Sequence, residues 1–340
     1  MRYAPVPIGA KFSFGDRRVG AVGLGTWSWG NKLLWDYDEK NDPVLAELFD
    51  EALRCGVGLF DTGNSYGTGK IEGRAEQLLG DFSEQTLYST LADQAVFATK
   101  IAPYPWILTR QSFVEECRKS CRRLRRTKIP LAQLHWSTAN YFPWQDKILW
   151  DGICDAFELG LIETVGLSNY GPKRLEQASS YLLSRGVQVA SCQVQLSLLC
   201  RGSLESGLLD LCDSEGINVI GYSPMALGLL SGKYGIAESK KRLCGFRARV
   251  FGDRSLREIQ RLLSLLSEIA STRGKTVSET AINWTLCQGC LVIAGAKSAE
   301  QGRSNFSAMN WRLSEAEVAE LEAEAKKCNF NIIQNIFQTS

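Results

Sequence analysis

Four side chains capable of acid–base chemistry stand at or just after the ends of apolar, strand-like runs. Asp61 ends the first run, and Tyr66 lies five positions later in a polar loop with glycines. Lys100 ends the second run, and His135, the only histidine of the chain, ends the third. Parallel barrels place catalytic groups at the carboxyl ends of their strands. The spacing therefore predicts that these four side chains meet at one end of a barrel.

Together the four residues suit the reduction of a carbonyl group. Tyr66 can act as general acid; its unperturbed pKa is about 10, and we expect the charge of Lys100 to lower it. Asp61 would pair with Lys100 and keep it charged and oriented. His135 can polarise the same carbonyl oxygen. Because no side chain supplies a hydride, the set implies a nicotinamide cofactor. Each residue taken singly also has a structural interpretation as a cap, packing residue or solvated charge.

The elements that would hold these residues alternate between strand and helix. The expected strands are 20–24, 59–61, 96–100, 131–135, 164–168, 189–195, 218–222 and 291–294. The expected helices are 42–55, 71–79, 111–125, 144–159, 172–183, 204–215, 254–273, 278–288, 298–305 and 314–327. A hairpin at 11–19 precedes them, and a long irregular segment spans about 225–253.

This order predicts an α/β fold: a (β/α)8 TIM barrel with an N-terminal β-hairpin and extra helices, forming one domain over residues 1–340. We expect the hairpin to close one end of the barrel. A doubly wound sheet would carry a third glycine after Gly23 and Gly25, and that glycine is missing.

Composition narrows the functional classes. The chain of 340 residues is 44% hydrophobic and carries a formal net charge of +2, so no general attraction to nucleic acid or membrane is expected. The basic run at 122–126 fits a solvated helix end. The 11 cysteines include one CxxC, Cys287 and Cys290, with no second pair to complete a zinc site. We expect buried thiols in a reducing compartment, no metal site and no membrane span.

The motifs that carry the four residues resemble the aldo-keto reductase superfamily from about Val19 onwards. They are Phe60-Asp61-Thr62 with Ser65-Tyr66-Gly67, then Ala98-Thr99-Lys100 and Gln133-Leu134-His135. The resemblance implies that Tyr66 is the proton donor and that Asp61 and Lys100 tune it. It also implies that His135 orients a small carbonyl substrate.

The same resemblance implies NADPH as cofactor and a set of residues to bind it. Ser168, Asn169 and Gln193 would bind the nicotinamide carboxamide, and Tyr222 would stack on its ring. Lys297, beside a helix start, would contact the 2′-phosphate. The whole expected set is Thr26, Trp27, Asp61, Ser168, Asn169, Gln193, Tyr222, Ser223, Pro224, Leu227, Gly228, Lys233, Gly295, Lys297, Gln301, Ser304 and Asn305. Ser304 stands where the family commonly has glutamate.

Loop motifs resemble one group within that family, the plant pyridoxal reductases of the chloroplast. These motifs surround Trp29, Trp106 and Trp136, and a further one lies in the tail at 333–339. The resemblance implies reduction of pyridoxal or a related ring aldehyde, and a plastid stroma location. The three indole rings would form walls for a flat ring, although ordinary packing over the barrel mouth explains them equally well.

A different class of function stays open at this point. The adenosine-end motif also resembles the β subunits of voltage-gated potassium channels, which would make the chain an NADPH-holding redox sensor. That group commonly has asparagine at the position of His135, so the histidine favours turnover. The sequence leaves the oligomeric state and the physiological substrate open.

Overall fold

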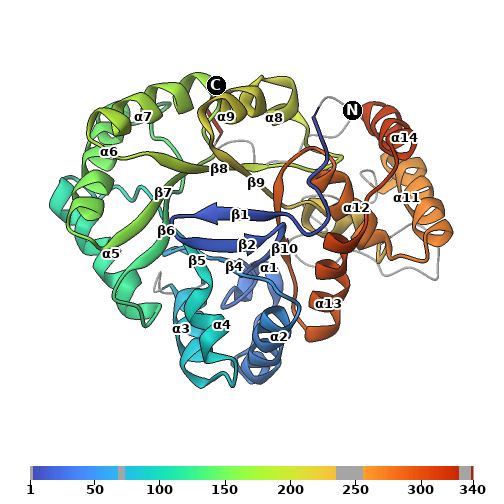
Figure 1. The fold of residues 1–340 in the computed structure, drawn as a ribbon, viewed down its shortest axis with the longest axis horizontal. Coiled ribbons are helices and arrows are strands. Elements are labelled where there is room, and N and C mark those ends of the chain that lie inside the picture. Colours follow the sequence, from blue (N-terminus) through green and yellow to red (C-terminus); the bar gives the residue numbers. More distant parts are fainter. Residues whose placement is uncertain (1–2, 68–72, 235–255, 329–337, 340) are drawn as a thin grey trace.

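The computed structural model describes residues 3–67, 73–234, 256–328 and 338–339 (Figure 1). Its centre is a closed barrel of eight parallel strands in the order β10-β3-β4-β5-β6-β7-β8-β9. The strands are β3 (Val22–Gly25), β4 (Leu59–Asp61), β5 (Val96–Ile101), β6 (Ile129–Leu134), β7 (Ile162–Ser168), β8 (Val189–Gln195), β9 (Asn218–Tyr222) and β10 (Leu291–Gly295). The predicted (β/α)8 fold is confirmed.

Helices surround the barrel, as Figure 1 shows. The longer ones are α2 (Asp42–Arg54), α3 (Arg74–Gln85), α5 (Arg110–Arg123), α6 (Pro143–Glu158), α7 (Pro172–Ser184), α9 (Leu208–Glu215), α11 (Gln260–Thr272), α12 (Val277–Leu286), α13 (Ala299–Ser307) and α14 (Glu315–Lys326). The short ones are α1 (Lys32–Trp35), α4 (Ser89–Gln94), α8 (Gly202–Glu205) and the 3-10 turns η1 (Glu39–Asn41), η2 (Ala226–Ser231) and η3 (Ala308–Asn310). From residue 235 on, the predicted irregular segment lies outside the described residues, as does most of the tail motif.

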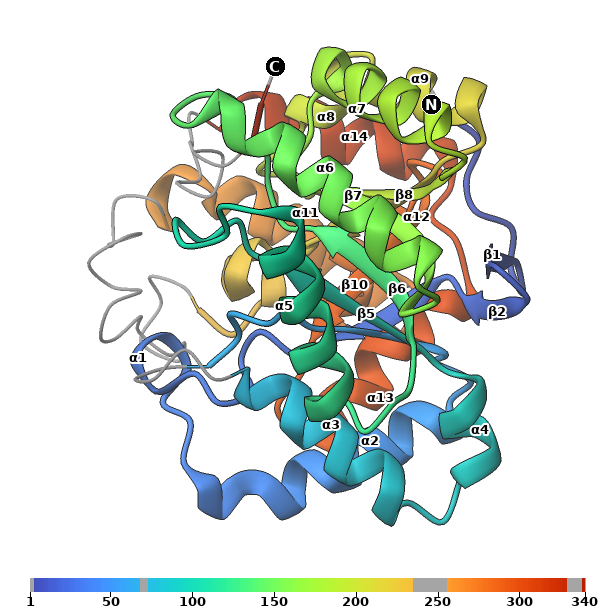
Figure 2. The ribbon, with the colours of Figure 1, turned by 90° about the vertical axis from the view of Figure 1, so that its left-hand side faces the viewer.

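A hairpin closes the amino-terminal end of the barrel. Strands β1 (Lys11–Phe14) and β2 (Arg17–Gly20) pair antiparallel, as predicted. Phe14 and Val19 are buried and pack on barrel-interior side chains such as Leu59. Figure 2 shows the hairpin on one side of the molecule and α1, which follows β3, on the other. The opposite end is therefore left for the loops that follow the strands.

Two of the helix predictions were wrong at a glycine. The helix expected at 71–79 was predicted to end before Gly80, but Gly80 lies inside α3, which runs from Arg74 to Gln85. A Cβ atom at Gly80 would lie 2.3 Å from the backbone oxygen of Arg123, so the glycine allows close packing of two segments. The helix expected at 204–215 is split into α8 and α9 at Gly207, whose φ of 79° suits glycine.

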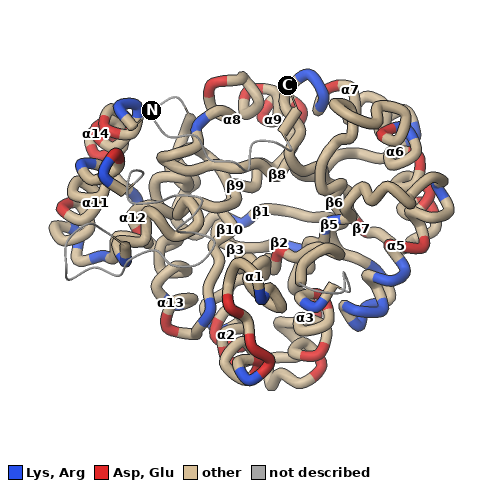
Figure 3. The backbone as a smooth tube through the Cα atoms, turned by 180° about the vertical axis from the view of Figure 1, so that it is seen from behind, with Lys and Arg blue, Asp and Glu red and all other residues tan. Residues whose placement is uncertain are grey.

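The charged residues of the described segments lie mostly on the outer helices (Figure 3). Within the basic run, Arg122 pairs with Glu115, and Arg123 pairs with Glu76. Arg125 and Arg126 pair with Asp81 and Asp93. The run therefore uses its charges within the protein. The cysteines of the described segments, Cys287 and Cys290 among them, are free thiols. No helix of those segments is long and apolar enough to cross a membrane.

Candidate active site

A buried ion pair forms the base of the site. Asp61 ends β4 and Lys100 lies near the end of β5, the neighbouring strand, so their side chains point into the barrel side by side. The ammonium of Lys100 donates to an oxygen of Asp61 and to the carbonyl oxygen of Thr62 at 2.9 Å. Gln193 on β8 donates to the same Asp61 oxygen at 2.8 Å. Burial raises the pKa of Asp61 and lowers the pKa of Lys100, and their mutual attraction opposes both shifts.

Tyr66 lies above this pair, in the loop after β4. The ammonium of Lys100 lies 4.9 Å from the centre of its ring, and the ring of His135 lies 5.8 Å away. Burial raises the pKa of Tyr66 well above its usual 10, and Asp61 and Tyr222 raise it further. The expectation that this pKa is lowered was wrong, because burial dominates the shift and the charge of Asp61 adds to it. Tyr66 is therefore a phenol that holds its proton firmly at neutral pH.

His135 follows the end of β6 and completes the cluster. Its backbone N–H donates to the carbonyl of Ile101 at 3.1 Å, and its own carbonyl accepts from Asn169 at 3.0 Å. Burial, and then the charge of Lys100, holds the pKa of His135 well below 6.5. The ring is therefore neutral at pH 7. A neutral imidazole still has one N–H to donate to a carbonyl oxygen.

The residues predicted to bind the nicotinamide carboxamide lie together beside these four. Asn169, at the end of β7, has a left-handed φ of 63° and accepts from the hydroxyl of Tyr222 at 2.7 Å. Its amide also donates to Ser168 at 3.3 Å. Gln193 reaches the same region through its contact with Asp61. The ends of β7, β8 and β9 therefore border the four acid–base residues with hydrogen-bonding groups.

Thr26 and Trp27, after β3, form another border of the site. The N–H and the hydroxyl of Thr26 each donate to the carbonyl oxygen of Asp61 at 2.9 Å. Trp27 lies edge-on to Trp35 with ring centres 5.8 Å apart. These contacts fix the backbone of Asp61 and place two indole rings in the loop region after β3.

The loop after β9 contains an unusual run of left-handed backbone. Ser223, Ala226 and Leu227 have φ values of 54°, 48° and 58°, and Gly228 has 96°. For residues other than glycine such conformations cost on the order of 1–3 kcal/mol each and cluster at ligand sites. Pro224, which is buried, interrupts this run, and Lys233 lies further along with its side chain exposed. This backbone is consistent with a loop shaped around a ligand.

The residues predicted for the adenosine end gather at the start of α13. Ser298 caps the helix and accepts from the N–H of Gln301 at 3.3 Å, while Gln301 accepts from the N–H of Lys297 at 3.2 Å. The ammonium of Lys297 donates to the carbonyl of Trp35 at 2.5 Å and lies 5.3 Å from the centre of its ring. A cation beside a helix N-terminus suits a phosphate.

Two further adenosine-end predictions have structural partners within the protein. Asn305 is buried and donates to the carbonyl of Gly295 at 3.1 Å, so it holds the end of β10. The hydroxyl of Ser304 lies 3.1 Å from that of Thr276, at the start of α12. The chemistry of this set, from Gln193 through the strained loop to Lys297, fits a phosphorylated nicotinamide dinucleotide.

The structure separates the three predicted substrate residues. The ring of Trp136 lies 4.7 Å from that of His135, and Trp106 is 57% exposed and stacks on Tyr104 at 4.5 Å. Trp29, in contrast, is fully buried and packs edge-on against Phe82 at 5.8 Å. Trp29 is therefore a core residue, and only Trp106 and Trp136 stay candidates for substrate contact.

Glu76 on α3, which no sequence motif indicated, lies next to the strand that carries Lys100. Its carboxylate is fully buried, accepts from Thr99 at 2.5 Å and pairs with Arg123 at 2.6 Å. Thr99 directly precedes Lys100, and the charge of Glu76 favours the protonated form of that lysine. The sequence did contain an indication of this role, because Glu76 is a charged residue among the apolar Ala75, Leu78 and Leu79 on the buried face of α3.

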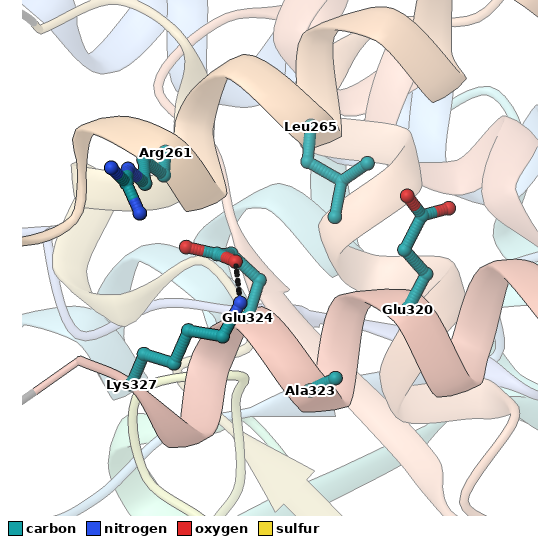
Figure 4. Close-up of a pocket in the computed structure, with 6 residues that line it drawn as sticks. All are labelled: Arg261, Leu265, Glu320, Ala323, Glu324 and Lys327. Atoms are coloured by element: carbon teal, nitrogen blue, oxygen red, sulfur yellow. Dashed lines mark hydrogen bonds and ion pairs between the residues drawn. The ribbon is translucent and has the colours of Figure 1, made fainter.

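A groove elsewhere on the described surface lies between α11 and α14 (Figure 4). It is lined by Arg261, Leu265, Glu320, Ala323, Glu324 and Lys327. Lys327 and Glu324 form an ion pair of 2.7 Å within it. Both helices lie at the periphery of the fold (Figure 1), so this groove is separate from the strand ends.

Comparison with known proteins gives a consistent result. The sequence pattern of the Aldo/keto reductase family matches residues 21–326. The chain is 44% identical to the chloroplastic pyridoxal reductase of Arabidopsis thaliana over 97% of its own length and 89% of that protein. It is 28% identical to the L-glyceraldehyde 3-phosphate reductase of Escherichia coli strain K12, over 93% of this chain and 92% of that one.

Among solved structures, the glycerol dehydrogenase of Gluconobacter oxydans superposes with a TM-score of 0.78 at 22% identity, covering 100% of both chains. An aldo/keto reductase from Klebsiella pneumoniae, solved in complex with NADP and acetate, gives a TM-score of 0.69 at 24% identity. It covers 92% of this chain and 94% of that one. At these identities the structures support the fold.

Proposed function

This chain belongs to the aldo/keto reductase family of oxidoreductases, and we propose that it reduces an aldehyde or ketone to an alcohol with NADPH. The observation that carries the proposal is the convergence of Tyr66, Lys100, Asp61 and His135 at the ends of β4, β5 and β6. A proton donor, a cation and a neutral imidazole thus border one point where a carbonyl oxygen can lie.

The protein residues divide the proton chemistry among them. Tyr66 holds the proton that the carbonyl oxygen needs as negative charge develops on it. His135, neutral at pH 7, donates a hydrogen bond to the same oxygen and orients it. Lys100 stabilises the phenolate of Tyr66 once the proton has left, and Asp61 holds Lys100 in place. When bound, the reduced nicotinamide supplies the hydride.

The groups that would hold the cofactor support NADPH in particular. Asn169 and Gln193 would bind the carboxamide, and Tyr222 would stack on the nicotinamide. Lys297 and the N-terminus of α13 would bind the 2′-phosphate, which carries roughly two negative charges. The ammonium of Lys297 now donates to the carbonyl oxygen of Trp35, so this hydrogen bond would weaken when the ammonium turns to the 2′-phosphate.

For the substrate we propose a ring aldehyde such as pyridoxal. Trp136 borders His135, and the exposed Trp106 presents a second aromatic face from the neighbouring loop. Aromatic faces favour a flat ring over a short aliphatic chain. The Arabidopsis relative is named for pyridoxal and the chloroplast. We extend both to this chain as part of the proposal, so that a plastid stroma location is included.

The test is cofactor oxidation by the purified protein with a panel of pyridoxal, other ring aldehydes, methylglyoxal and propanal. The proposal predicts turnover with NADPH and the highest kcat/KM with a ring aldehyde. Equal kcat/KM for pyridoxal and propanal would remove the support for pyridoxal and leave general aldehyde reduction. Tight NADPH binding without turnover on any carbonyl compound would contradict the enzyme and favour a redox sensor.

A further inference from the structure

Two adjacent buried polar residues at the start of α6 contact the two loops that carry Trp106 and Trp136, the candidate walls of the substrate site. Gln145 and Asp146 are each 1% exposed, although amide and carboxylate groups are costly to bury. Helix α6 lies between α5 and α7 (Figure 1), beside the loops that follow β5 and β6. Their hydrogen bonds go to residues other than the four acid–base residues. Their partners identify what they do.

Gln145 holds the loop after β5. Its amide nitrogen donates to the carbonyl of Tyr104 at 2.8 Å and to the carbonyl of Ile107 at 3.1 Å. These two carbonyls flank Trp106, and the ring of Tyr104 stacks on that of Trp106. The other amide atom, Oε1, is buried without a hydrogen bond. Burial of Oε1 without a partner is unfavourable, yet the amide nitrogen of the same side chain fixes the turn around Trp106.

Asp146 holds the loop after β6. Its carboxylate accepts from the N–H of Thr138 at 2.6 Å, from the hydroxyl of Thr138 at 2.9 Å and from the hydroxyl of Ser137. Arg174 on α7 compensates its charge, with Nε at 3.1 Å. Ser137 directly follows Trp136. The carboxylate therefore fixes the two residues that directly follow Trp136.

We propose that Gln145 and Asp146 form a clamp that sets the position of Trp106 relative to Trp136 and thereby selects ring aldehydes over small ones. The two residues are neighbours in one helical turn, so the loops that they hold cannot shift independently of each other. They are positioning residues, because they affect the substrate only through the positions of Trp106 and Trp136. The selection of ring aldehydes rests on the proposed function. Whether the two residues hold the loops can be tested without any substrate.

The first experiment compares Gln145→Met with the wild type. Methionine keeps the length of the side chain but removes both donated hydrogen bonds, and it leaves no unpartnered Oε1, so the fold is expected to persist. Because the loop around Trp106 is then held less firmly, kcat/KM for pyridoxal should fall about tenfold, mainly through KM. For methylglyoxal, which is too small to span both walls, kcat/KM should change by less than about twofold.

A matched control is Gln288→Met. Gln288 is also buried and also donates from its amide, to Glu322 at 3.1 Å, but it lies just before β10 at the other end of the barrel. It should leave the ratio of the two kcat/KM values unchanged. An equal loss for pyridoxal and methylglyoxal in Gln145→Met, or no loss, would overturn the selection of ring aldehydes by the clamp.

The second experiment is amide hydrogen exchange in the absence of substrate and cofactor. Gln145→Met should accelerate exchange in residues 102–109, and Asp146→Asn should do so in 135–142, while β8 stays protected. Unchanged exchange in both loops would overturn the clamp whatever the substrate is. If the wild type reduces no ring aldehyde, the proposed substrate fails, and the exchange result alone then decides whether the clamp exists.

Discussion

Replacing Lys100 by methionine should lower stability and abolish activity for two different reasons. Lys100 and Asp61 are 1% and 4% exposed, so the variant leaves a buried carboxylate without its cation. Asp61 would keep the amide of Gln193, and the carbonyl of Thr62 would lose its donor. Removing one partner of a buried ion pair typically costs about 3–5 kcal/mol. We expect the free energy of unfolding at pH 7.5 to fall by about that amount.

The pH dependence of this loss has a definite sign. Burial already raises the pKa of Asp61 in the folded protein, and loss of the ammonium should raise it further. Above the pKa of an unfolded aspartate, about 3.9, the unfolded chain then binds fewer protons than the folded one. Stability of Lys100→Met should therefore decrease as pH rises through the interval between the two pKa values, and the deficit should be smallest in acid.

Urea denaturation followed by tryptophan fluorescence measures these free energies at several pH values. The control is the double variant Asp61→Asn/Lys100→Met, which removes both charges from the buried site. It should recover much of the lost stability, because a buried pair replaced as a whole is nearly neutral. It should remain inactive. Equal stability of Lys100→Met and the wild type, or a double variant less stable than the single one, would refute this reasoning.

Three other predictions concern the coenzyme, the substrate and the packing. Lys297→Met should weaken NADPH binding on the order of ten- to a hundredfold in fluorescence titration and leave NADH almost unchanged; equal weakening would show that Lys297 does not contact the 2′-phosphate. The ratio of kcat/KM for pyridoxal to that for propanal should exceed one in the wild type and fall in Trp136→Ala; an unchanged ratio would exclude that ring as a wall. Gly80→Ala should lose about 1–3 kcal/mol of stability in urea, since its Cβ would meet the backbone of Arg123; full stability would contradict the close contact.

The barrel and the convergence of the four acid–base residues were predictable from local pattern. Strands buried on both faces read as continuous apolar runs, and the ranges expected for β8 and β9 match the structure residue for residue. The end of such a run locates Asp61, Lys100 and His135 without knowledge of the packing. Helix ends were less predictable, since Gly80 serves contact between segments and not helix termination.

Properties that depend on tertiary neighbours could not be predicted in this way. The pKa of Tyr66 is raised by burial and by the charge of Asp61, and the sequence shows the types of these groups but not their burial or distances. Trp29 lies in a motif full of aromatic residues, yet its ring packs on Phe82 inside the core. Gln145 looks like an ordinary polar residue of a helix until its partners in a different loop are known.

The proton donor is the central claim, and Tyr66→Phe tests it most directly. The variant keeps the ring beside Lys100 and His135 and removes only the hydroxyl. NADPH affinity, measured by fluorescence titration, should stay within about twofold of the wild type. Pre-steady-state oxidation of bound NADPH by pyridoxal should slow by roughly 10²–10⁴-fold. Oxidation at a near wild-type rate would contradict the account, because the proton would then come from another group.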